Sequence, residues 1–202
     1  MNTKVKLNPD SNQLLVVTGG IASGKSLVVQ NLQEIGFNTL SSDEITRNLI
    51  SSTGEAFEAV CDLAPDALID GEINRSKLAE IALNDQIKLT ALENILHPLI
   101  HQFRVRWIKL INSEAEPKGI ALEIPLYYEK KIQVNPQYVI ATVCRVDTQK
   151  RRALERANMI PALVDNILAR QVNNDYRMKH ADIIINTDLS LDETKAQVYR
   201  LL

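Results

Sequence analysis

Cysteine is scarce in this sequence, and it does not occur in the patterns that mark metal or redox centres. The chain of 202 residues contains two cysteine residues. Cys61 and Cys144 lie far apart, and neither belongs to a C-x-x-C pair or to a cluster of cysteine and histidine residues, which are the usual signatures of such centres. We therefore interpret both as free thiols that pack like small apolar side chains.

Long apolar runs and a strong charge imbalance are also missing. No run approaches the ~20 apolar residues that a helix needs to cross a bilayer, and residues 1–13 lack the apolar core of a signal peptide. The formal net charge of −2 gives no overall field that would hold a nucleic acid or an anionic membrane surface. These features predict a cytoplasmic protein that binds neither nucleic acid nor membrane.

Short apolar runs alternate with helical patterns over most of the chain. Predicted strands lie at Leu14–Val17, Phe37–Leu40, Gly119–Ile124, Tyr138–Val143 and Asp182–Asn186. Predicted helices cover Lys25–Ile35, a segment that begins near Asp43 and runs through Leu49, the arginine-rich and lysine-rich Gln149–Lys179, and Asp192–Leu202. Strands that alternate with helices indicate an α/β fold with a parallel sheet.

The segment from Thr53 to about Asn112 interrupts this alternation. Its pattern is helical, with breaks at Pro65, Asp70–Gly71 and Pro98, and no part of it is a convincing strand. We interpret residues 1–202 as one domain, because this length suits one core with appendages. The core would comprise about 14–42, 118–148 and 181–202, a helical insertion about 43–117, and a helical lid segment about 149–180.

A phosphate-binding loop follows the first predicted strand and precedes the first predicted helix. The pattern G-x-x-x-x-G-K-[ST] is matched by Gly19, Gly20, Ile21, Ala22, Ser23, Gly24, Lys25 and Ser26. In such a loop the backbone N–H groups and the helix N-terminus hold phosphates, the lysine reaches the β- and γ-phosphates, and the serine hydroxyl is a Mg²⁺ ligand. The alternative is an unrelated glycine turn with a solvated lysine, and the correct flanks argue against it.

Five motifs in the same order resemble those of dephospho-coenzyme A kinases. The loop with Thr18 resembles the family's T-G-G-I-x-S-G-K-S. Residues 42–47 resemble D-A-D-x-I-x-R, and residues 96–100 match L-H-P-x-I. Residues 123–129 resemble the P-L-L-F-E segment, and a late group resembles the family's lid and its A-D-x-x-I-x-N strand: Arg152, Arg156, Gln171, Arg177, Asp182 and Asn186. The resemblance spans the chain from Leu14 onward.

Three positions depart from the family pattern. Ser41 stands where the family usually has aspartate, and Leu27 stands where it has threonine. Asn158 replaces an aspartate that is common in the lid. Leu27 lacks the hydroxyl that could contact the α-phosphate, and one such hydrogen bond would contribute about 1 kcal/mol. The missing carboxylate at position 41 is expected to affect the surroundings of Asp43, and these changes bear on efficiency more than on identity.

Asp43 is the candidate catalytic base. It follows a predicted strand, so it lies at the carboxyl end of the sheet, where α/β proteins bind their ligands. A carboxylate there can orient an acceptor hydroxyl and take its proton. The alternative is that Asp43 caps the helix beginning near Glu44. Arg47 lies four residues further along and can share the helical face of Asp43, where it would hold an anionic substrate group or form a surface ion pair.

Arg152 and Arg156 are candidate catalytic residues of the lid segment. They are four residues apart in a predicted helix and would share a face. Guanidinium groups grip phosphate oxygens, and a closing lid excludes water that would hydrolyse ATP. The alternative is a solvated basic face.

The resemblance implies further binding residues. Gly20 to Leu27 and Asn186 would bind ATP, with Asn186 beside the adenine. The acceptor would be bound by Thr18, Asp43, Arg47, His97, Pro125, Leu126, Tyr128 and Glu129. From the residues alone, His97 before Pro98 favours a helix cap, the Tyr127–Glu129 segment can be a loop that packs on the core, and Asn186 can be a turn residue.

The residues predict phosphoryl transfer from ATP with Mg²⁺, and the resemblance implies that dephospho-coenzyme A is the acceptor. One alternative is another small P-loop kinase that acts on a nucleotide or nucleoside, because the loop and lid are shared. Another is a P-loop regulatory protein, although the N-K-x-D motif of GTPases does not occur. We expect a monomer or a small homo-oligomer.

Overall fold

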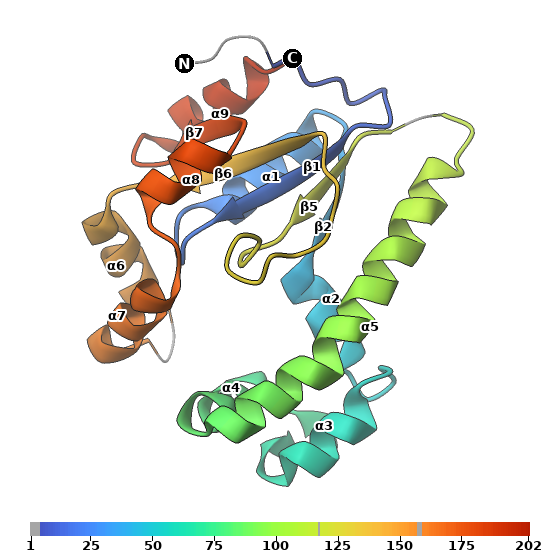
Figure 1. The fold of residues 1–202 in the computed structure, drawn as a ribbon, viewed down its shortest axis with the longest axis vertical. Coiled ribbons are helices and arrows are strands. Elements are labelled where there is room, and N and C mark those ends of the chain that lie inside the picture. Colours follow the sequence, from blue (N-terminus) through green and yellow to red (C-terminus); the bar gives the residue numbers. More distant parts are fainter. Residues whose placement is uncertain (1–4, 117, 157–158) are drawn as a thin grey trace. The chain divides into compact units, whose positions relative to one another are not determined.

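The protein was studied as a computed structural model that describes residues 5–116, 118–156 and 159–202. It divides into two compact units. One comprises Met1–Ser41 with Ile111–Leu202, and the other is Ser42–Leu110. We call them the core unit and the insertion unit, and each is described by itself (Figure 1).

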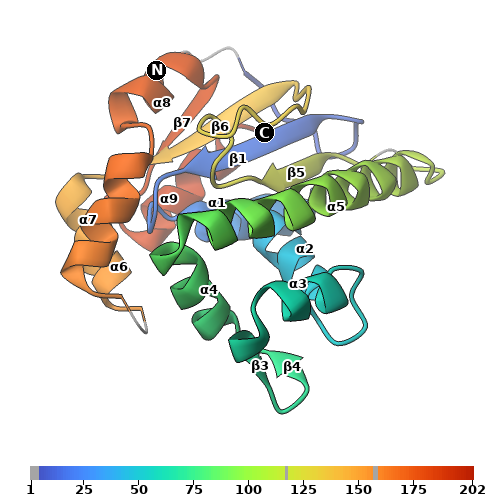
Figure 2. The same cartoon turned by 60° about the horizontal axis from the view of Figure 1, so that its bottom comes forward.

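A five-stranded parallel sheet organises the core unit. Neighbouring strands follow the order β2-β5-β1-β6-β7, and each pair runs parallel. The strands are β1 (Leu14–Gly19), β2 (Asn38–Ser41), β5 (Ile120–Glu123), β6 (Tyr138–Val143) and β7 (Ile183–Asn186). β1 therefore lies in the middle, between β5 and β6 (Figure 2). The predicted α/β fold with a parallel sheet is confirmed.

The central strand is buried because its side chains are almost all apolar. Leu15, Val16 and Val17 have no exposed surface, as expected for a parallel strand covered on both faces. Leu15 and Val17 belong to the main hydrophobic core with side chains from α1 (Lys25–Glu34) and α9 (Leu191–Tyr199). Burial of each such side chain contributes about 1.5–3 kcal/mol, and this packing fixes the loop that leaves β1.

Three short helices lie between β6 and β7 and form the lid segment. They are α6 (Val146–Leu154), α7 (Pro161–Arg170) and α8 (Asn174–His180). Arg156 lies beyond the end of α6, so the prediction that it shares a helical face with Arg152 is wrong. Pro161 starts a new helix, and Ile160 before it is extended, because proline disfavours the helical conformation in the preceding residue. Asn158 lies outside the described residues.

The insertion unit is one continuous segment that leaves the sheet after β2 and returns towards β5, the neighbour of β2. It contains α2 (Ser42–Leu49), α3 (Phe57–Leu63), a 3₁₀ turn at Pro65–Ala67, β3 (Leu68–Ile69), β4 (Glu72–Ile73), α4 (Arg75–Asn84) and most of α5 (Gln86–Asn112). Leu49, Ala56, Val60, Leu78 and Ala82 are among its buried apolar residues. The chain therefore makes a single excursion from the sheet.

Proline does not break α5, contrary to the prediction from sequence. The helix runs through Pro98. Proline removes one backbone hydrogen bond, the one that the carbonyl of Asn94 would otherwise accept. Asn94 and Pro98 are both exposed, so water can hydrate that carbonyl and the helix continues. No helix among the described residues is long and apolar enough to cross a membrane.

A small hairpin also contradicts the prediction that this segment contains no strand. β3 and β4 pair antiparallel across Asp70–Gly71. Both turn residues have positive φ, 52° for Asp70 and 81° for Gly71, the geometry that Asp-Gly turns favour in two-residue hairpins. The Asp-Gly pair is read as a helix break from sequence because each flanking strand is only two residues long.

Candidate functional site

The phosphate loop connects β1 to α1, as predicted, and parts of its backbone have positive φ. Ala22 has φ of 54° and Gly24 has φ of 83°. Glycine adopts positive φ without a steric penalty, whereas alanine pays about 1–2 kcal/mol. α1 begins directly at Lys25, so its N-terminal N–H groups and the positive end of its dipole are available to an anion.

Lys25 folds back along this loop. Its Nζ donates hydrogen bonds to the carbonyls of Gly19, at 3.1 Å, and Gly20, at 2.8 Å. The ammonium group is thereby held against the backbone at the start of the loop. Since ammonium is a compact point charge with three donors, it can serve phosphate oxygens from this position.

Residues of β6 and of the turn after β7 hold the loop at Ser23. Ser23 Oγ hydrogen bonds to Thr142 Oγ1 of β6, at 2.6 Å. Thr187 Oγ1, directly after β7, donates to the carbonyl of Ser23, at 2.8 Å. All three residues are buried. The loop is therefore pinned to the sheet before any ligand arrives, and a preorganised loop loses less entropy on binding.

A buried carboxylate that the sequence reasoning missed lies beside Ser26. Glu123 is the last residue of β5, is only 7% exposed, and accepts a hydrogen bond from Ser26 Oγ at 3.4 Å. The available signal was an acidic residue at the end of an apolar strand, and β5 is paired with β1. A carboxylate and a hydroxyl are the oxygen donors that Mg²⁺ prefers.

These two oxygen donors fit Mg²⁺ only together with ligands from elsewhere. The described residues contain no group of three or more His, Cys, Asp or Glu side chains that could hold a metal ion. Mg²⁺ is usually held by one or two protein ligands, substrate phosphates and waters. The Ser26 and Glu123 pair matches that pattern and does not match a cage made entirely of protein ligands.

Asp43 and Arg47 lie on α2 of the insertion unit. α2 follows β2 directly, so the chain keeps Asp43 two residues beyond the carboxyl end of that strand. Asp43 belongs to the first turn of α2, where a carboxylate is stabilised by the helix dipole, and it is not a cap before a helix that begins at Glu44. Asp43 and Arg47 are both exposed. His97 is exposed in the middle of α5, so the interpretation of His97 as a helix cap is wrong.

The two lid arginines have different surroundings. The Arg152 guanidinium is partly buried and donates a hydrogen bond from Nη2 to the carbonyl of Thr187, at 2.7 Å. Arg156 is exposed beyond the end of α6. Arg152 is therefore fixed to the backbone just after β7, whereas Arg156 is free to extend towards solvent.

Asn186 ends β7 and shapes the turn that follows. Its Oδ1 accepts a hydrogen bond from the N–H of Asp188, at 2.9 Å. Gln197 of α9 bonds to both the N–H and the carbonyl of Asn186, at 3.0 and 2.7 Å. These contacts agree with the alternative interpretation that Asn186 is a turn residue. Because Oδ1 is already bonded, a role in adenine binding would use the side-chain NH₂ group of Asn186.

The segment after β5 is fixed to the core at both ends. The carbonyl of Pro125 accepts a hydrogen bond from Thr18 Oγ1, at 3.3 Å, and Leu126 is 36% exposed. At the far end Glu129 Oε1 pairs with Arg177 Nη2 at 3.0 Å, with side-chain exposures of 10% and 3%. Glu129 Oε1 also accepts from the N–H of Val172, at 3.0 Å. Glu129, predicted to bind the acceptor, is thus held within the protein.

Tyr128 has a buried hydroxyl without a hydrogen-bond partner among the described residues. Its ring makes edge contacts with Tyr127 and Tyr176, with centroids 5.2 and 5.6 Å apart. Burial and nearby tyrosines raise the pKa of Tyr128 to about 12. A buried hydroxyl with an unused donor is costly, which makes it a natural contact for a polar ligand.

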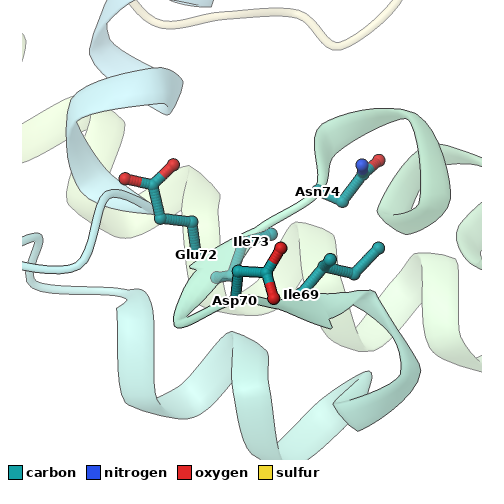
Figure 3. Close-up of a pocket in the computed structure, with 5 residues that line it drawn as sticks. All are labelled: Ile69, Asp70, Glu72, Ile73 and Asn74. Atoms are coloured by element: carbon teal, nitrogen blue, oxygen red, sulfur yellow. The ribbon is translucent and has the colours of Figure 1, made fainter.

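A separate hollow lies on the insertion unit and contains none of the predicted site residues. It has a volume of about 230 Å³ and is lined by Ile69, Asp70, Glu72, Ile73 and Asn74. The carboxylates of Asp70 and Glu72 point to different sides of the hairpin (Figure 3). Because they diverge, they form no paired acidic site there.

Comparisons with known proteins identify one family across the chain. The model of the family described as dephospho-CoA kinase matches residues 13–193. A dephospho-CoA kinase of Hydrogenovibrio crunogenus is 34% identical over 187 residues, which cover 92% of this chain and 94% of that protein. A dephospho-CoA kinase of Bartonella quintana is 30% identical over 190 residues, covering 94% and 96%.

Solved structures show the same fold. A crystal structure from Thermus thermophilus matches with a TM-score of 0.78 at 23% identity, covering 94% of this chain and 95% of that one. A dephospho-CoA kinase from Campylobacter jejuni matches with a TM-score of 0.65 at 24% identity and the same coverage. The family match, the relatives and the intact phosphate loop agree, and the chain belongs to the dephospho-CoA kinase family.

Proposed function

We propose that the protein transfers the γ-phosphoryl group of ATP to the ribose 3′-hydroxyl of dephospho-CoA and releases CoA and ADP. Membership of a kinase family supports ATP as the co-substrate. The observation that carries the proposal is the phosphate loop, in which Lys25 is held between the carbonyls of Gly19 and Gly20 at the start of α1. The acceptor comes from the family relationship.

The loop residues would bind and orient the triphosphate. The N–H groups from Ala22 to Leu27, which include the N-terminal end of α1, offer donors for phosphate oxygens. Lys25 balances the charge on the β- and γ-phosphates. Ser26 and Glu123 would hold Mg²⁺, directly or through water. When bound, Mg²⁺ supplies positive charge that offsets the charge of the transferring group.

Asp43 would orient the acceptor hydroxyl and take its proton. As the bond from the ribose oxygen to the γ-phosphorus forms, the bond from that phosphorus to the β–γ bridging oxygen breaks, and ADP leaves. The hydroxyl proton goes to Asp43. Phosphoryl transfer depends mainly on position and charge, so an exposed carboxylate that meets the acceptor only when it binds is sufficient.

The lid arginines would take separate parts in this reaction. Arg152 is bonded to the carbonyl of Thr187, the residue that follows Asn186. It is therefore suited to the nucleotide side of the site. Arg156 is exposed and can move its guanidinium towards the transferring phosphoryl group, where it would offset negative charge.

The residues proposed to recognise the acceptor come from the family resemblance. Thr18, Pro125, Leu126 and Tyr128 belong to the core unit, and Asp43, Arg47 and His97 belong to the insertion unit. The buried hydroxyl of Tyr128, which has no partner among residues 5–116, 118–156 and 159–202, supports this role. Glu129 would act indirectly, by holding Arg177.

One experiment tests the reaction and the acceptor together. The purified protein is incubated with Mg²⁺ and ATP and, in separate tubes, with dephospho-CoA, adenosine, AMP or no acceptor, and the products are identified by mass. We expect a gain of one phosphate on dephospho-CoA alone, with ADP formed in equal amount. Phosphorylation of AMP or adenosine instead would indicate another small-molecule kinase. ATP binding without any phosphorylated product would indicate a regulatory protein.

The setting of the reaction is part of the same proposal. We place it in the cytoplasm, where thiols such as those of Cys61 and Cys144 are kept reduced. We also propose a monomer or a small homo-oligomer, which the molar mass in solution would test.

A further inference from the structure

Two glutamine side chains of the lid segment bind both backbone polar groups of one loop residue. The N–H of Ile21 donates to Gln171 Oε1 at 2.8 Å. The carbonyl of Ile21 accepts from Gln149 Nε2 at 2.9 Å. Gln149 is only 3% exposed, so its amide is buried against the loop. One loop residue is thereby held from two sides.

The absence of a side chain at Gly20 makes this contact possible. A Cβ at Gly20 would collide with Gln149 Nε2, and it would lie 3.4 Å from Gln171 Oε1 and 3.5 Å from Arg177 Nη1. The pattern G-x-x-x-x-G-K-[ST] leaves this position open, so phosphate binding by itself does not demand glycine there. Glycine is required there because the side-chain amides of Gln149 and Gln171 approach the backbone closely.

Both glutamines are mounted on well-anchored elements. Gln149 lies in α6, and Ala153 of that helix packs with Ile21, Ala22 and Val164 in a small buried cluster. Gln171 follows α7 directly. The next N–H, that of Val172, is bound by Glu129, which in turn pairs with buried Arg177. Gln171 is therefore positioned without help from the loop, whereas α6 packs on the loop through Ala153 and is also held by the hydrogen bond from Arg152 to the carbonyl of Thr187.

These contacts bear on the strained part of the loop. Ile21 precedes Ala22, whose φ of 54° is unfavourable for alanine. Such a conformation persists only where its surroundings enforce it. With both backbone polar groups of Ile21 bonded to glutamines, its N–H is not available to phosphates.

We propose that Gln149 and Gln171 are positioning residues that hold Ile21, and through it Ala22, in the geometry that binds nucleotide phosphates. We call this pair the glutamine latch. The inference rests on the nucleotide-binding part of the proposed function and is independent of the acceptor. It predicts that the lid segment influences nucleotide affinity through the loop backbone.

Replacement of each glutamine by glutamate provides a matched pair of variants. Gln171→Glu keeps an oxygen that accepts the N–H of Ile21, whereas Gln149→Glu removes the donor and sets a carboxylate against the carbonyl of Ile21. Both add one negative charge beside Gly20, so electrostatic repulsion of the nucleotide is common to both. Gln149→Met removes the hydrogen bond without adding charge.

The measurement is the Kd of ADP with Mg²⁺ by calorimetry, below the unfolding temperature of each variant. We expect Gln149→Glu to bind ADP about tenfold more weakly than Gln171→Glu, and Gln149→Met to bind about fivefold to tenfold more weakly than the unaltered protein, as for the loss of one hydrogen bond. Asp165→Asn, which breaks the exposed ion pair with Lys150 in the same segment, should change Kd by less than about twofold.

Equal loss in the two glutamate variants, or unchanged affinity in Gln149→Met, would overturn the latch and leave the proposed function standing. A latch that only stabilised the lid would lower the unfolding temperature without this difference in Kd. Failure of the unaltered protein to bind ADP would overturn the proposed function and the latch together.

Discussion

The phosphate loop and helix α2 carry two parts of the proposed chemistry, and the chain holds them in different ways. Ser23, Ile21 and Lys25 in the loop are bonded to β6, to the lid segment and to the loop's own carbonyls. Asp43 and Arg47 on α2 are exposed. The nucleotide therefore meets a loop that is already bonded in place, whereas Asp43 and Arg47 face solvent. Four predictions test this contrast, from the largest expected effect to the smallest.

Lys25→Ala should have the largest effect. The side chain provides positive charge beside the loop backbone, so its loss should lower kcat by about a thousandfold or more, comparable to losses of essential charge in other enzymes. Steady-state kinetics with dephospho-CoA measure this. The unfolding temperature should change little, because Lys25 is only partly buried. A variant that retained activity would remove the loop from the reaction.

Asp43→Asn should lower kcat by about a hundredfold to ten-thousandfold, the usual contribution of a general base. The Kd of ATP should stay within about twofold, because the carboxylate is assigned to the acceptor. Glu44→Gln, the exposed neighbour in the same helical turn, is the control for the change of charge. Parallel losses of kcat and ATP affinity in Asp43→Asn would instead make Asp43 part of the nucleotide or Mg²⁺ site.

Glu129→Gln should act mainly on stability. It leaves the buried Arg177 guanidinium without its charged partner, and the loss of one member of a buried pair typically costs about 3–5 kcal/mol. The retained amide oxygen should reduce this to about 2–3 kcal/mol, measured by denaturant unfolding. The exposed pair Lys77 and Glu80 offers a control, since Glu80→Gln should cost less than about 1 kcal/mol. A large rise in the KM for dephospho-CoA with unchanged stability would return Glu129 to the acceptor site.

Tyr128→Phe should have the smallest effect near neutral pH, with a change in unfolding free energy below about 1 kcal/mol, because the hydroxyl has no hydrogen-bond partner to lose within the described part of the chain. The pKa of Tyr128 is raised to about 12 in the folded protein, compared with about 10 in an unfolded chain. Its neutral form therefore favours folding fully below pH ~10, and this contribution is lost as pH rises to ~12.

Denaturant unfolding between pH 9 and 12 compares the two proteins. Over this range the unaltered protein should lose about 2 kcal/mol more than Tyr128→Phe. Parallel curves would mean that the hydroxyl is solvated and not buried. A rise in the KM for dephospho-CoA in this variant would support the role of Tyr128 in acceptor binding.

Local sequence patterns were sufficient to predict much of the core unit. The apolar runs of β1, β5 and β6 leave few alternatives to buried parallel strands. The loop motif correctly predicted a strand before it and a helix after it. The family prediction from the motifs is confirmed. These features depend on neighbours in sequence, which is why they could be read without a structure.

The errors arose where the local structure or the role of a residue depends on contacts with solvent or with residues distant in sequence. Pro98 indicates a break locally, yet the exposed face of α5 tolerates the lost hydrogen bond. Arg156 fits a helical spacing, but the helix ends before it. Glu123 and Gln149 could not be assigned from their own segments, because their partners, Ser26 and Ile21, are about a hundred residues or more away in the chain. The assignments of the site residues remain predictions.

The insertion unit leaves the sheet at β2 and returns at its neighbour β5 as one uninterrupted segment. A core that receives the chain back beside the point where it left can exchange this segment in evolution without any change in strand order. Mutations and length changes there can accumulate while the phosphate loop stays constant. The same scaffold can thereby vary the part of acceptor recognition that is assigned to Asp43, Arg47 and His97 without any change to the loop that binds the nucleotide.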